Sequence, residues 1–200
     1  MYLWLLLAHL VGVVAFVAGC GAYTASVDRL PRAGSVAELR ALLTVAAMGA
    51  KVLTIGSVPM ILGGVALALD GWSFSDGWIV TAIALAVVQG AAGLFVDRRV
   101  GRLDAALDEA ADGPVPPELR ALAGDGLMHA IDRAAMASLA ELVFLMTVKP
   151  GTMGILVSLA TATLAGAVLA WTVAAGRRTR GARERALPRA NPSVPPSSGR

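Results

Sequence analysis

Ionisable side chains are rare inside the apolar parts of this 200-residue chain, and the few that lie there are its candidates for chemistry. They are His9, Lys51, Glu141 and Lys149, and Gln89 is the one amide among the apolar blocks. A charged group at the centre of a bilayer costs about 2.5 kcal/mol or more, so such residues commonly bind a ligand, pair with one another or carry protons.

His9 stands in LLLAHLVG, too deep within an apolar run to reach the membrane surface. It therefore needs a partner, and a neutral imidazole is also a ligand for haem iron and other metals. Glu141, in ASLAELVF, is the costliest of the group. It precedes Lys149 by eight residues, about 80° beyond two full helical turns, so the two side chains share nearly one helix face. Glu141 could pair with His9 or be held protonated. His9, Glu141 and Lys149 are thus the candidate cofactor-binding residues, with His9 the candidate metal ligand.

Each of these residues also has a purely structural interpretation. Lys51 and Lys149 stand near the ends of apolar blocks, where a lysine extends its ammonium group to the headgroups. Pro150 and Gly151 end the helix that precedes them. Gln89 is of a type that commonly forms a hydrogen bond between helices.

The sequence contains no phosphate-binding loop, no paired Cys/His set and no Ser/His/Asp arrangement, so catalytic residues cannot be assigned. Cys20 is the single cysteine, which excludes an intramolecular disulfide. His129 lies in a charged connector, where we expect it to be solvated. Four methionines could offer soft ligands to copper, although scattered methionines usually serve packing. They are Met48, Met60, Met146 and Met153.

The composition is that of a polytopic membrane protein. Hydrophobic residues make up 56% of the chain, charged residues only 16%, and the mean hydropathy is +0.70. The apolar residues come in blocks of roughly 20, the length that crosses about 30 Å of hydrocarbon. We predict an all-α fold with a four-helix transmembrane core at 1–151, whose spans are about 2–23, 48–69, 77–96 and 130–148. A fifth transmembrane helix follows at 152–176, and 177–200 is predicted as a disordered tail rich in Arg, Pro and Ser.

The arginines predict the orientation of the chain. With the N-terminus outside and five spans, all 15 arginines fall in the first loop, the third loop or the tail, all on the cytoplasmic side. The chain is therefore expected in a bacterial cytoplasmic membrane, N-terminus out and C-terminus in. Because the positive charge flanks apolar blocks, it does not indicate nucleic-acid binding. The bilayer is the expected partner, and the arginine-rich tail could also contact anionic headgroups.

Two charged segments allow alternatives. In the third connector, Val100, Leu103 and Leu107 recur at helical spacing, which indicates either an inward extension of the third helix or a short partner-docking helix. The fourth span either extends inward through LMHAIDRAAM or is short and tilted.

Small residues predict close helix packing. They are Gly12, Ala15, Ala18, Gly19, Gly21 and Ala22 in the first span and Gly56, Gly63 and Gly64 around Pro59 in the second. Pro59 is expected to kink its helix. VAGC at Cys20 looks like a lipoprotein cleavage site, but no basic residue precedes this apolar run, so we interpret it as an uncleaved helix.

Four stretches carry a resemblance: MYLWLLLAHLVGVVAFVAG, SVPMILGGVALAL, GWIVTAIALAVV and ELVFLMTVKPG. Together they resemble an uncharacterised family of small bacterial integral membrane proteins whose four-helix core ends in a Met-Val-Leu-Lys-Pro-like sequence, over roughly residues 1–151. That family is similar in layout to the four-helix membrane protoporphyrinogen oxidases and to the copper-resistance D-type membrane domain. The likeness to the oxidases implies a haem b or porphyrin pocket, with His9 as axial ligand and Lys149 as its partner.

Three functions follow from these observations. The first is a non-enzymatic structural or accessory membrane component, alone, as a homo-oligomer or within a membrane complex. The first alternative is a haem- or porphyrin-binding redox protein that uses His9, and the second is a small copper or ion transporter.

Overall fold

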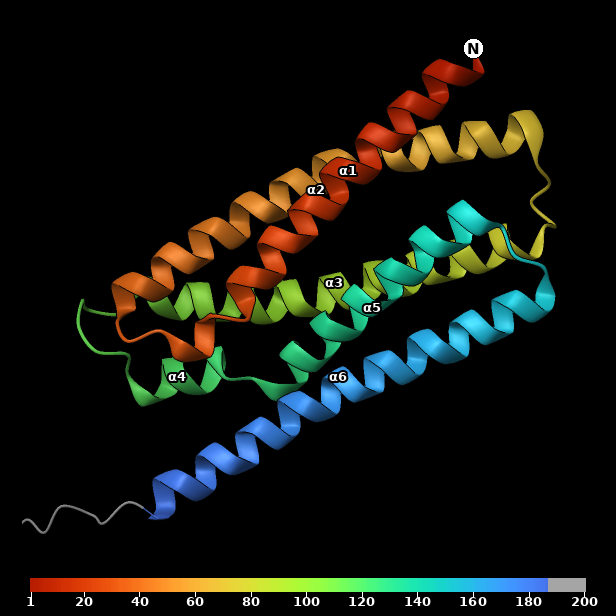
Figure 1. The fold of residues 1–200 in the computed structure, drawn as a ribbon. Helices are drawn as coiled ribbons and strands as arrows, with labels where there is room; N and C mark the ends of the chain where they lie inside the picture. Colours follow the sequence, from red (N-terminus) through yellow and green to blue (C-terminus); the bar gives the residue numbers. More distant parts are fainter. Residues whose placement is uncertain (187–200) are drawn as a thin grey trace, which may run out of the picture.

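The chain folds into long antiparallel helices joined by short connectors, in a computed structural model that describes residues 1–186 (Figure 1). No strand is formed within these residues, and the predicted all-α fold class is confirmed. The elements in chain order are α1 (Tyr2–Val27), the 3-10 helix η1 (Leu30–Arg32), α2 (Val36–Gly71), α3 (Gly77–Asp108), α4 (Pro117–Ala123), α5 (Gly126–Val148) and α6 (Thr152–Ala186).

Three segments within residues 1–186 are long and apolar enough to cross a membrane. They are Tyr2–Arg32, Val36–Gly71 and Gly77–Asp108, while α6 contains a shorter apolar part, Thr152–Val168. α5 has 23 residues but carries Asp132, Arg133 and Glu141. The membrane prediction is supported by these three segments, and the count of four spans plus a fifth stays a prediction.

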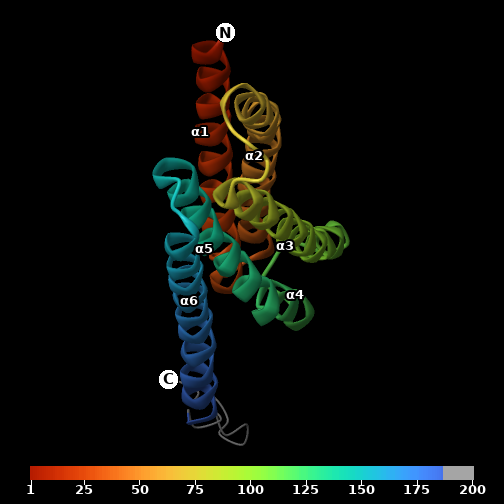
Figure 2. The ribbon, with the colours of Figure 1, turned by 90° about the vertical axis from the view of Figure 1, so that its right-hand side faces the viewer.

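The connectors gather at two opposite ends of the molecule. One end, which we call the base, contains η1, α4 and the helix ends beside them, from residues 24–43 and 95–133 (Figure 1). The far end contains the N-terminus, the α2–α3 loop and the turn between α5 and α6. Figures 1 and 2 both show α1 lying along α2 and α5 lying along α6.

α2 begins at a capping box and continues through a proline. The Ser35 side chain accepts a hydrogen bond from the Glu38 N–H at 3.2 Å, and the Glu38 carboxylate accepts one from the Gly34 N–H at 2.8 Å. Pro59 lies within the helix, and the axis of α2 changes direction past its midpoint (Figure 1).

Glycines spaced seven residues apart pack α1 against α2. Gly12 of α1 faces Gly56 of α2, Gly19 faces Gly49, and Gly63 lies against His9; all five glycines are buried. A Cβ atom added at Gly12 would lie 2.8 Å from the Gly56 carbonyl oxygen, and one added at Gly19 would lie 2.7 Å from that of Gly49. The predicted close packing is confirmed for these positions, because the two backbones touch where side chains are absent.

Within residues 1–186, the base holds the larger of two buried apolar clusters. Its members come from α1, η1, α2, α3, α4, α5 and the connectors between them: Val27, Leu30, Ala33, Val36, Leu39, Leu43, Val96, Val100, Leu103, Leu107, Val115, Leu119, Ala123 and Met128. The charged segment after residue 96 continues α3 to Asp108, and its apolar stripe is buried in this cluster. The extension predicted for α3 is therefore correct, and the docking-helix alternative is wrong.

Arg40 ties the start of α2 to the end of α3. Its guanidinium donates to the carbonyls of Leu107 at 3.1 Å and Ala110 at 2.7 Å, and it pairs with Asp112. A cation that binds the last carbonyls of a helix satisfies groups with no partner inside that helix. The base is thus an ordered layer built from connectors that the sequence shows as charged loops.

The ends of α5 and α6 nearest the base bear on two of the sequence predictions. α5 extends inward through LMHAIDRAAM to Gly126, as the first alternative predicted. α6 packs against α3 and α5 through Ala82, Leu145 and Ile155. It continues to Ala186, so residues 177–186, predicted as part of a disordered tail, are helical; five of these ten residues are arginines, which favour helix. The remainder of that tail, 187–200, lies outside the described residues.

Candidate functional site

His9 lies at the contact between α1 and α2. Its Nδ1 is 2.7 Å from the carbonyl oxygen of Met60, and the side chain is half-buried. A carbonyl oxygen only accepts hydrogen bonds, so Nδ1 carries the hydrogen and donates it. Gly64 makes room for the ring, because a Cβ atom there would lie 3.1 Å from Cε1 of His9.

This orientation leaves Nε2 as the basic nitrogen of a neutral imidazole. Histidines that bind metals commonly donate their other N–H to a carbonyl, which sets the tautomer and the ring direction. The bond to Met60 therefore fits His9 as an axial ligand of haem iron or as a metal ligand. His9 would be the only histidine ligand at this place. The other histidine, His129, lies against Asp28, and Asp28 follows the end of α1, about 28 Å from His9 along the helix.

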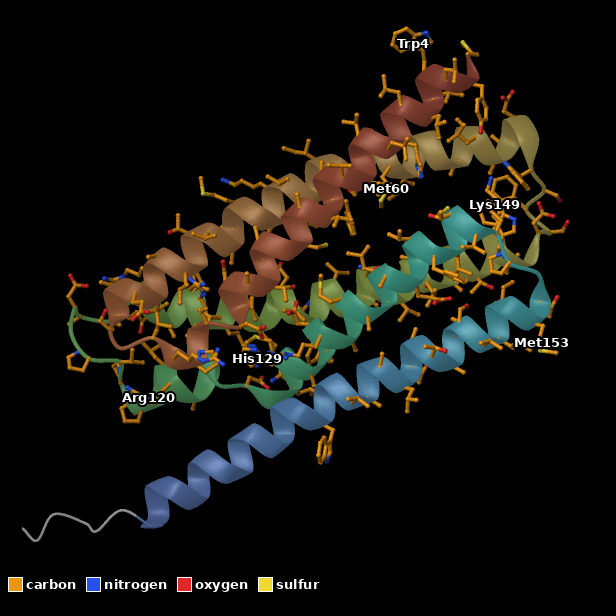
Figure 3. All side chains as sticks on the ribbon, in the orientation of Figure 1. Trp4, Met60, Arg120, His129, Lys149 and Met153 are labelled. Atoms are coloured by element: carbon orange, nitrogen blue, oxygen red, sulfur yellow. The ribbon has the colours of Figure 1, made fainter. Side chains whose placement is uncertain are left out.

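Lys149 lies at the far end of α5 and contacts two tryptophans (Figure 3). Its Nζ is 4.0 Å from the ring centroid of Trp72 and 5.7 Å from that of Trp78, and the two rings meet edge to face. Lys149 also ends α5 in the left-handed conformation, with φ +49°. This cation–π contact joins the turn after α5 to the start of the α2–α3 loop.

Glu141 is buried in the middle of α5, with 6% of its surface exposed. Its Oε1 accepts a hydrogen bond of 2.6 Å from the hydroxyl of Ser158 on α6. The costly carboxylate thus has a partner on the neighbouring helix.

His9, Glu141 and Lys149, the three predicted site residues, contact three different parts of the structure. His9 binds the backbone of α2, Glu141 binds α6, and Lys149 lies on the tryptophans at the far end. No hydrogen bond or ion pair between them is formed within the described residues. Nor does that part of the chain hold a group of three or more His, Cys, Asp or Glu residues able to bind a metal ion. Met48, Met146 and Met153 are exposed on α2, α5 and α6.

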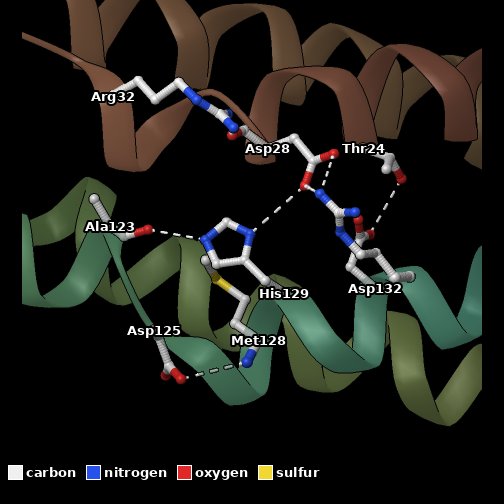
Figure 4. A network of polar contacts seen from close by, with 9 residues as sticks. Thr24, Asp28, Arg32, Ala123, Asp125, Met128, His129 and Asp132 are labelled. Atoms are coloured by element: carbon white, nitrogen blue, oxygen red, sulfur yellow. Dashed lines mark hydrogen bonds and ion pairs between the residues drawn. The ribbon is translucent and has the colours of Figure 1, made fainter. Parts of the chain in front are cut away.

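A second set of polar residues lies in the base, where α5 meets the end of α1 (Figure 4). Asp28, just after α1, accepts hydrogen bonds from Nη2 of Arg133 at 2.9 and 3.0 Å. Thr24 donates to Asp132 at 3.2 Å, and Asp132 is 6% exposed. These contacts join the α1–α2 pair to α5.

His129 belongs to this set, and the expectation that it is solvated is wrong. It is only 3% exposed. Its Nε2 lies 3.0 Å from the Ala123 carbonyl oxygen, and its Nδ1 lies 3.9 Å from Oδ1 of Asp28. Burial results from α4 and the end of α1, which cover the first turns of α5 on the side that carries the histidine.

Asp125 closes this region at the start of α5. Its Oδ1 accepts hydrogen bonds from the N–H groups of Leu127 and Met128, at 3.0 and 3.3 Å, and its Oδ2 pairs with Arg99 of α3. Burial alone would raise the pKa of Asp125, but the two N–H donors and Arg99 outweigh it and hold the pKa below its ordinary value.

The family model for predicted integral membrane proteins of the DUF2269 type matches residues 3–150 of this chain. The chain belongs to the DUF2269 family. This confirms the resemblance to an uncharacterised membrane family. Among curated proteins and solved structures, none matches the chain.

The DUF2269 segment contains both groups of candidate residues. His9, Glu141, Lys149 and the polar residues of the base all lie within 3–150, and so does the glycine contact between α1 and α2. α6, which supplies Ser158 to Glu141, lies beyond it.

One signal in the sequence could have revealed the base residues. His129, Asp132 and Arg133 are spaced i, i+3 and i+4, so they share one face of a helix. A helix face that carries an acid, a base and a histidine cannot pack against apolar side chains alone. It therefore indicates that polar groups of another element contact it. The partner itself, Asp28, stands 101 residues before His129 and has no local signal.

Proposed function

We propose that this DUF2269 protein is a non-enzymatic structural or accessory component of a bacterial cytoplasmic membrane. One observation carries the proposal: the spanning candidates leave most of their apolar surface uncovered. Only 11% of the most apolar 18-residue window is buried in Tyr2–Arg32 and in Val36–Gly71, and 22% in Gly77–Asp108. Such surface requires lipid or another membrane chain to cover it.

The arrangement of polar groups supports the same function. The two ionisable residues within apolar helix contacts, His9 and Glu141, each bind a neighbouring helix. The ion pairs of Asp28 and Asp125 lie in the base and hold elements together. These are the contacts of a scaffold, and they do not converge as a catalytic set would.

We further propose five spans, α1, α2, α3, α5 and α6, with the N-terminus outside and the base in the cytoplasm. Of the eight arginines between residues 29 and 133, Arg29 lies just before η1 and the others lie in η1, α2, α3, α4 and α5, within the residue ranges 24–43 and 95–133 of the base. This distribution is the one that the positive-inside rule requires. The arginines of 177–200 are then cytoplasmic too, where they would contact anionic headgroups.

Site-specific photocrosslinking in cells tests the accessory role. A crosslinker at Val14 or Val87, which are 69% and 67% exposed, should give one discrete protein adduct, either a second copy or another membrane chain. The same crosslinker at Leu39, which is fully buried, should give none. Adducts with lipid alone at both exposed positions would contradict the proposal.

A second candidate is a haem- or porphyrin-binding protein, and the bond between His9 and Met60 favours it. His9 would hold the iron through Nε2, and the haem would supply electron transfer when bound. The Met60 carbonyl sets the tautomer of His9, and Gly64 leaves the space that the imidazole ring occupies.

The visible spectrum of the purified protein separates the two candidates. After expression with a haem precursor, the haem alternative predicts a Soret band that is lost in His9→Ala and kept in Met48→Leu, an exposed control position. A colourless, folded protein would exclude the haem alternative and leave the accessory role standing.

A further inference from the structure

The junction between the α1–α2 pair and α5 depends on a histidine that neither candidate function uses. His129 lies in the first turns of α5, between Ala123 at the end of α4 and Asp28 after α1 (Figure 4). Its ring is almost completely removed from solvent, at 3% exposed.

Both ring nitrogens of His129 face hydrogen-bond acceptors. Nε2 is 3.0 Å from the Ala123 carbonyl oxygen, which cannot donate, so Nε2 carries a hydrogen. In a neutral imidazole Nδ1 would then present its lone pair to the Asp28 carboxylate, 3.9 Å away. An imidazolium instead presents N–H groups to both acceptors.

The charges around the ring have both signs. Across from it, Asp28 is negative and already accepts two hydrogen bonds from Arg133. Asp132, buried and one turn along α5, is a second carboxyl group in this region, and Tyr23 and Thr24 of α1 lie on its side.

The remaining charged groups near the ring are paired or exposed. Asp125 at the start of α5 pairs with Arg99 of α3. Arg32 of η1 is exposed and donates to the backbone carbonyl of Asp28 at 2.7 Å. Asp28 and Asp132 are the two carboxyl groups nearest the ring, and half-buried Arg133 pairs with Asp28. A proton on His129 places a second cation beside the same Asp28 carboxylate.

We propose that His129 is a proton-binding site, and that its proton fastens α5 and α4 to the end of α1 in the base. The bound proton converts a lone pair facing a carboxylate into a charge-assisted contact across this junction. Proton loss would weaken the link between the α1–α2 pair and the other helices, so the base would loosen as the surrounding pH rises. This proposal is independent of whether the protein binds haem or a partner.

Folding is then linked to proton uptake. A group that holds its proton more tightly in the folded than in the unfolded state stabilises the fold at low pH and loses this effect as pH rises. If the folded state holds the proton about tenfold more tightly, the ratio of folded to unfolded protein falls about tenfold across the range where a histidine titrates.

The experiment measures equilibrium unfolding of the full chain in detergent between pH 5.5 and 8.5. The chain has two histidines, so His9→Gln is the matched control for His129→Gln. Wild type and His9→Gln should lose stability as pH rises, and His129→Gln should lose clearly less, with any dependence that remains coming from the buried Asp132 that all three proteins share. Equal pH dependence in both variants, or stability that rises with pH in wild type, would overturn the proposal.

A spectroscopic measurement covers the case in which His129→Gln does not fold. In ¹⁵N-histidine-labelled His9→Gln protein only one imidazole remains, and its nitrogen shifts report its protonation directly. An imidazolium at pH 7 that loses its proton at higher pH supports the proposal, and a neutral ring at pH 6 would overturn it.

Discussion

Replacing Gly19 with alanine should separate α1 from α2. The added Cβ would lie 2.7 Å from the Gly49 carbonyl oxygen and 2.8 Å from Cα of Leu53. Ordinary contacts between such atoms begin near 3.4 Å, so the overlap with the carbonyl oxygen is about 0.7 Å, and the backbone nitrogen of Leu53 would be closer still. All of the clashing atoms belong to the backbone of α2, so no side chain can rotate away, and the helices themselves must move apart.

The cost can be estimated from the behaviour of overfilled cores. One extra methyl group in a tightly packed contact costs about 1–3 kcal/mol, and here it also separates the neighbouring glycine contacts. We therefore expect Gly19→Ala to lower the free energy of unfolding by about 2 kcal/mol relative to a control without the clash. That difference is about 30-fold in the unfolding equilibrium.

Gly21 supplies the control, because it lies two residues further along α1 and a Cβ there meets no atom within 4 Å. Both substitutions change the helix preference of the chain equally, so their difference isolates the contact with α2. Equilibrium unfolding in mixed micelles of mild detergent and dodecyl sulfate measures both. Gly19→Ala and Gly21→Ala of equal stability would refute the packing described for α1 and α2.

A double variant sharpens the same test. A Cβ at Gly49 would lie 2.8 Å from the backbone nitrogen of Tyr23 and 2.9 Å from the Gly19 carbonyl oxygen. Once one substitution has forced the helices apart, the second meets less resistance. Gly19→Ala with Gly49→Ala should therefore cost clearly less than the two single changes added together, and strict additivity would argue against a shared contact.

Three further predictions concern the polar residues. Lys149→Met should cost about 1 kcal/mol in unfolding experiments by removing the cation from the indoles beneath it, whereas Lys51→Met, at an exposed site, should be neutral. Asp125→Ala should cost about 1 kcal/mol or more at pH 7. Because the folded pKa of Asp125 is lowered, its stabilisation is present above the ordinary value of 3.8 and is lost as pH falls through the folded value, so wild type and variant should converge in acid. Glu141→Gln should keep the contact with Ser158 and fold normally, and Glu141→Ala should be destabilised to a similar extent as Ser158→Ala; a Glu141→Gln variant as unstable as Glu141→Ala would argue against a purely structural role.

The helices and their contact faces could be predicted because they depend on local patterns. Blocks of apolar residues indicate the membrane helices, and the spacing of Val100, Leu103 and Leu107 indicates the extension of α3. Gly12 and Gly19 mark the face of α1 that meets α2. In each case residues of one type recur at helical intervals in the sequence, and the helix face that they form is the one that packs against a neighbouring helix.

The base could not be predicted in the same way. Burial of His129 requires Ala123 and Asp28, which reach it from different elements. A charged segment between two apolar blocks is usually solvated, and only the packing of α4 and η1 makes it part of a buried layer. The partners of Glu141 and Lys149 likewise depend on which helices are neighbours, and sequence spacing does not determine this.

The side of the membrane on which the base lies is the most direct test of the proposed arrangement. Dual reporters, one active only in the cytoplasm and one only outside it, can be fused after Ser73 in the α2–α3 loop and after Arg180 in α6. The five-span arrangement predicts outside activity at Ser73 and cytoplasmic activity at Arg180. Outside activity after Arg180 would contradict it, because the arginine-rich end of the chain would then lie on the wrong side of the membrane.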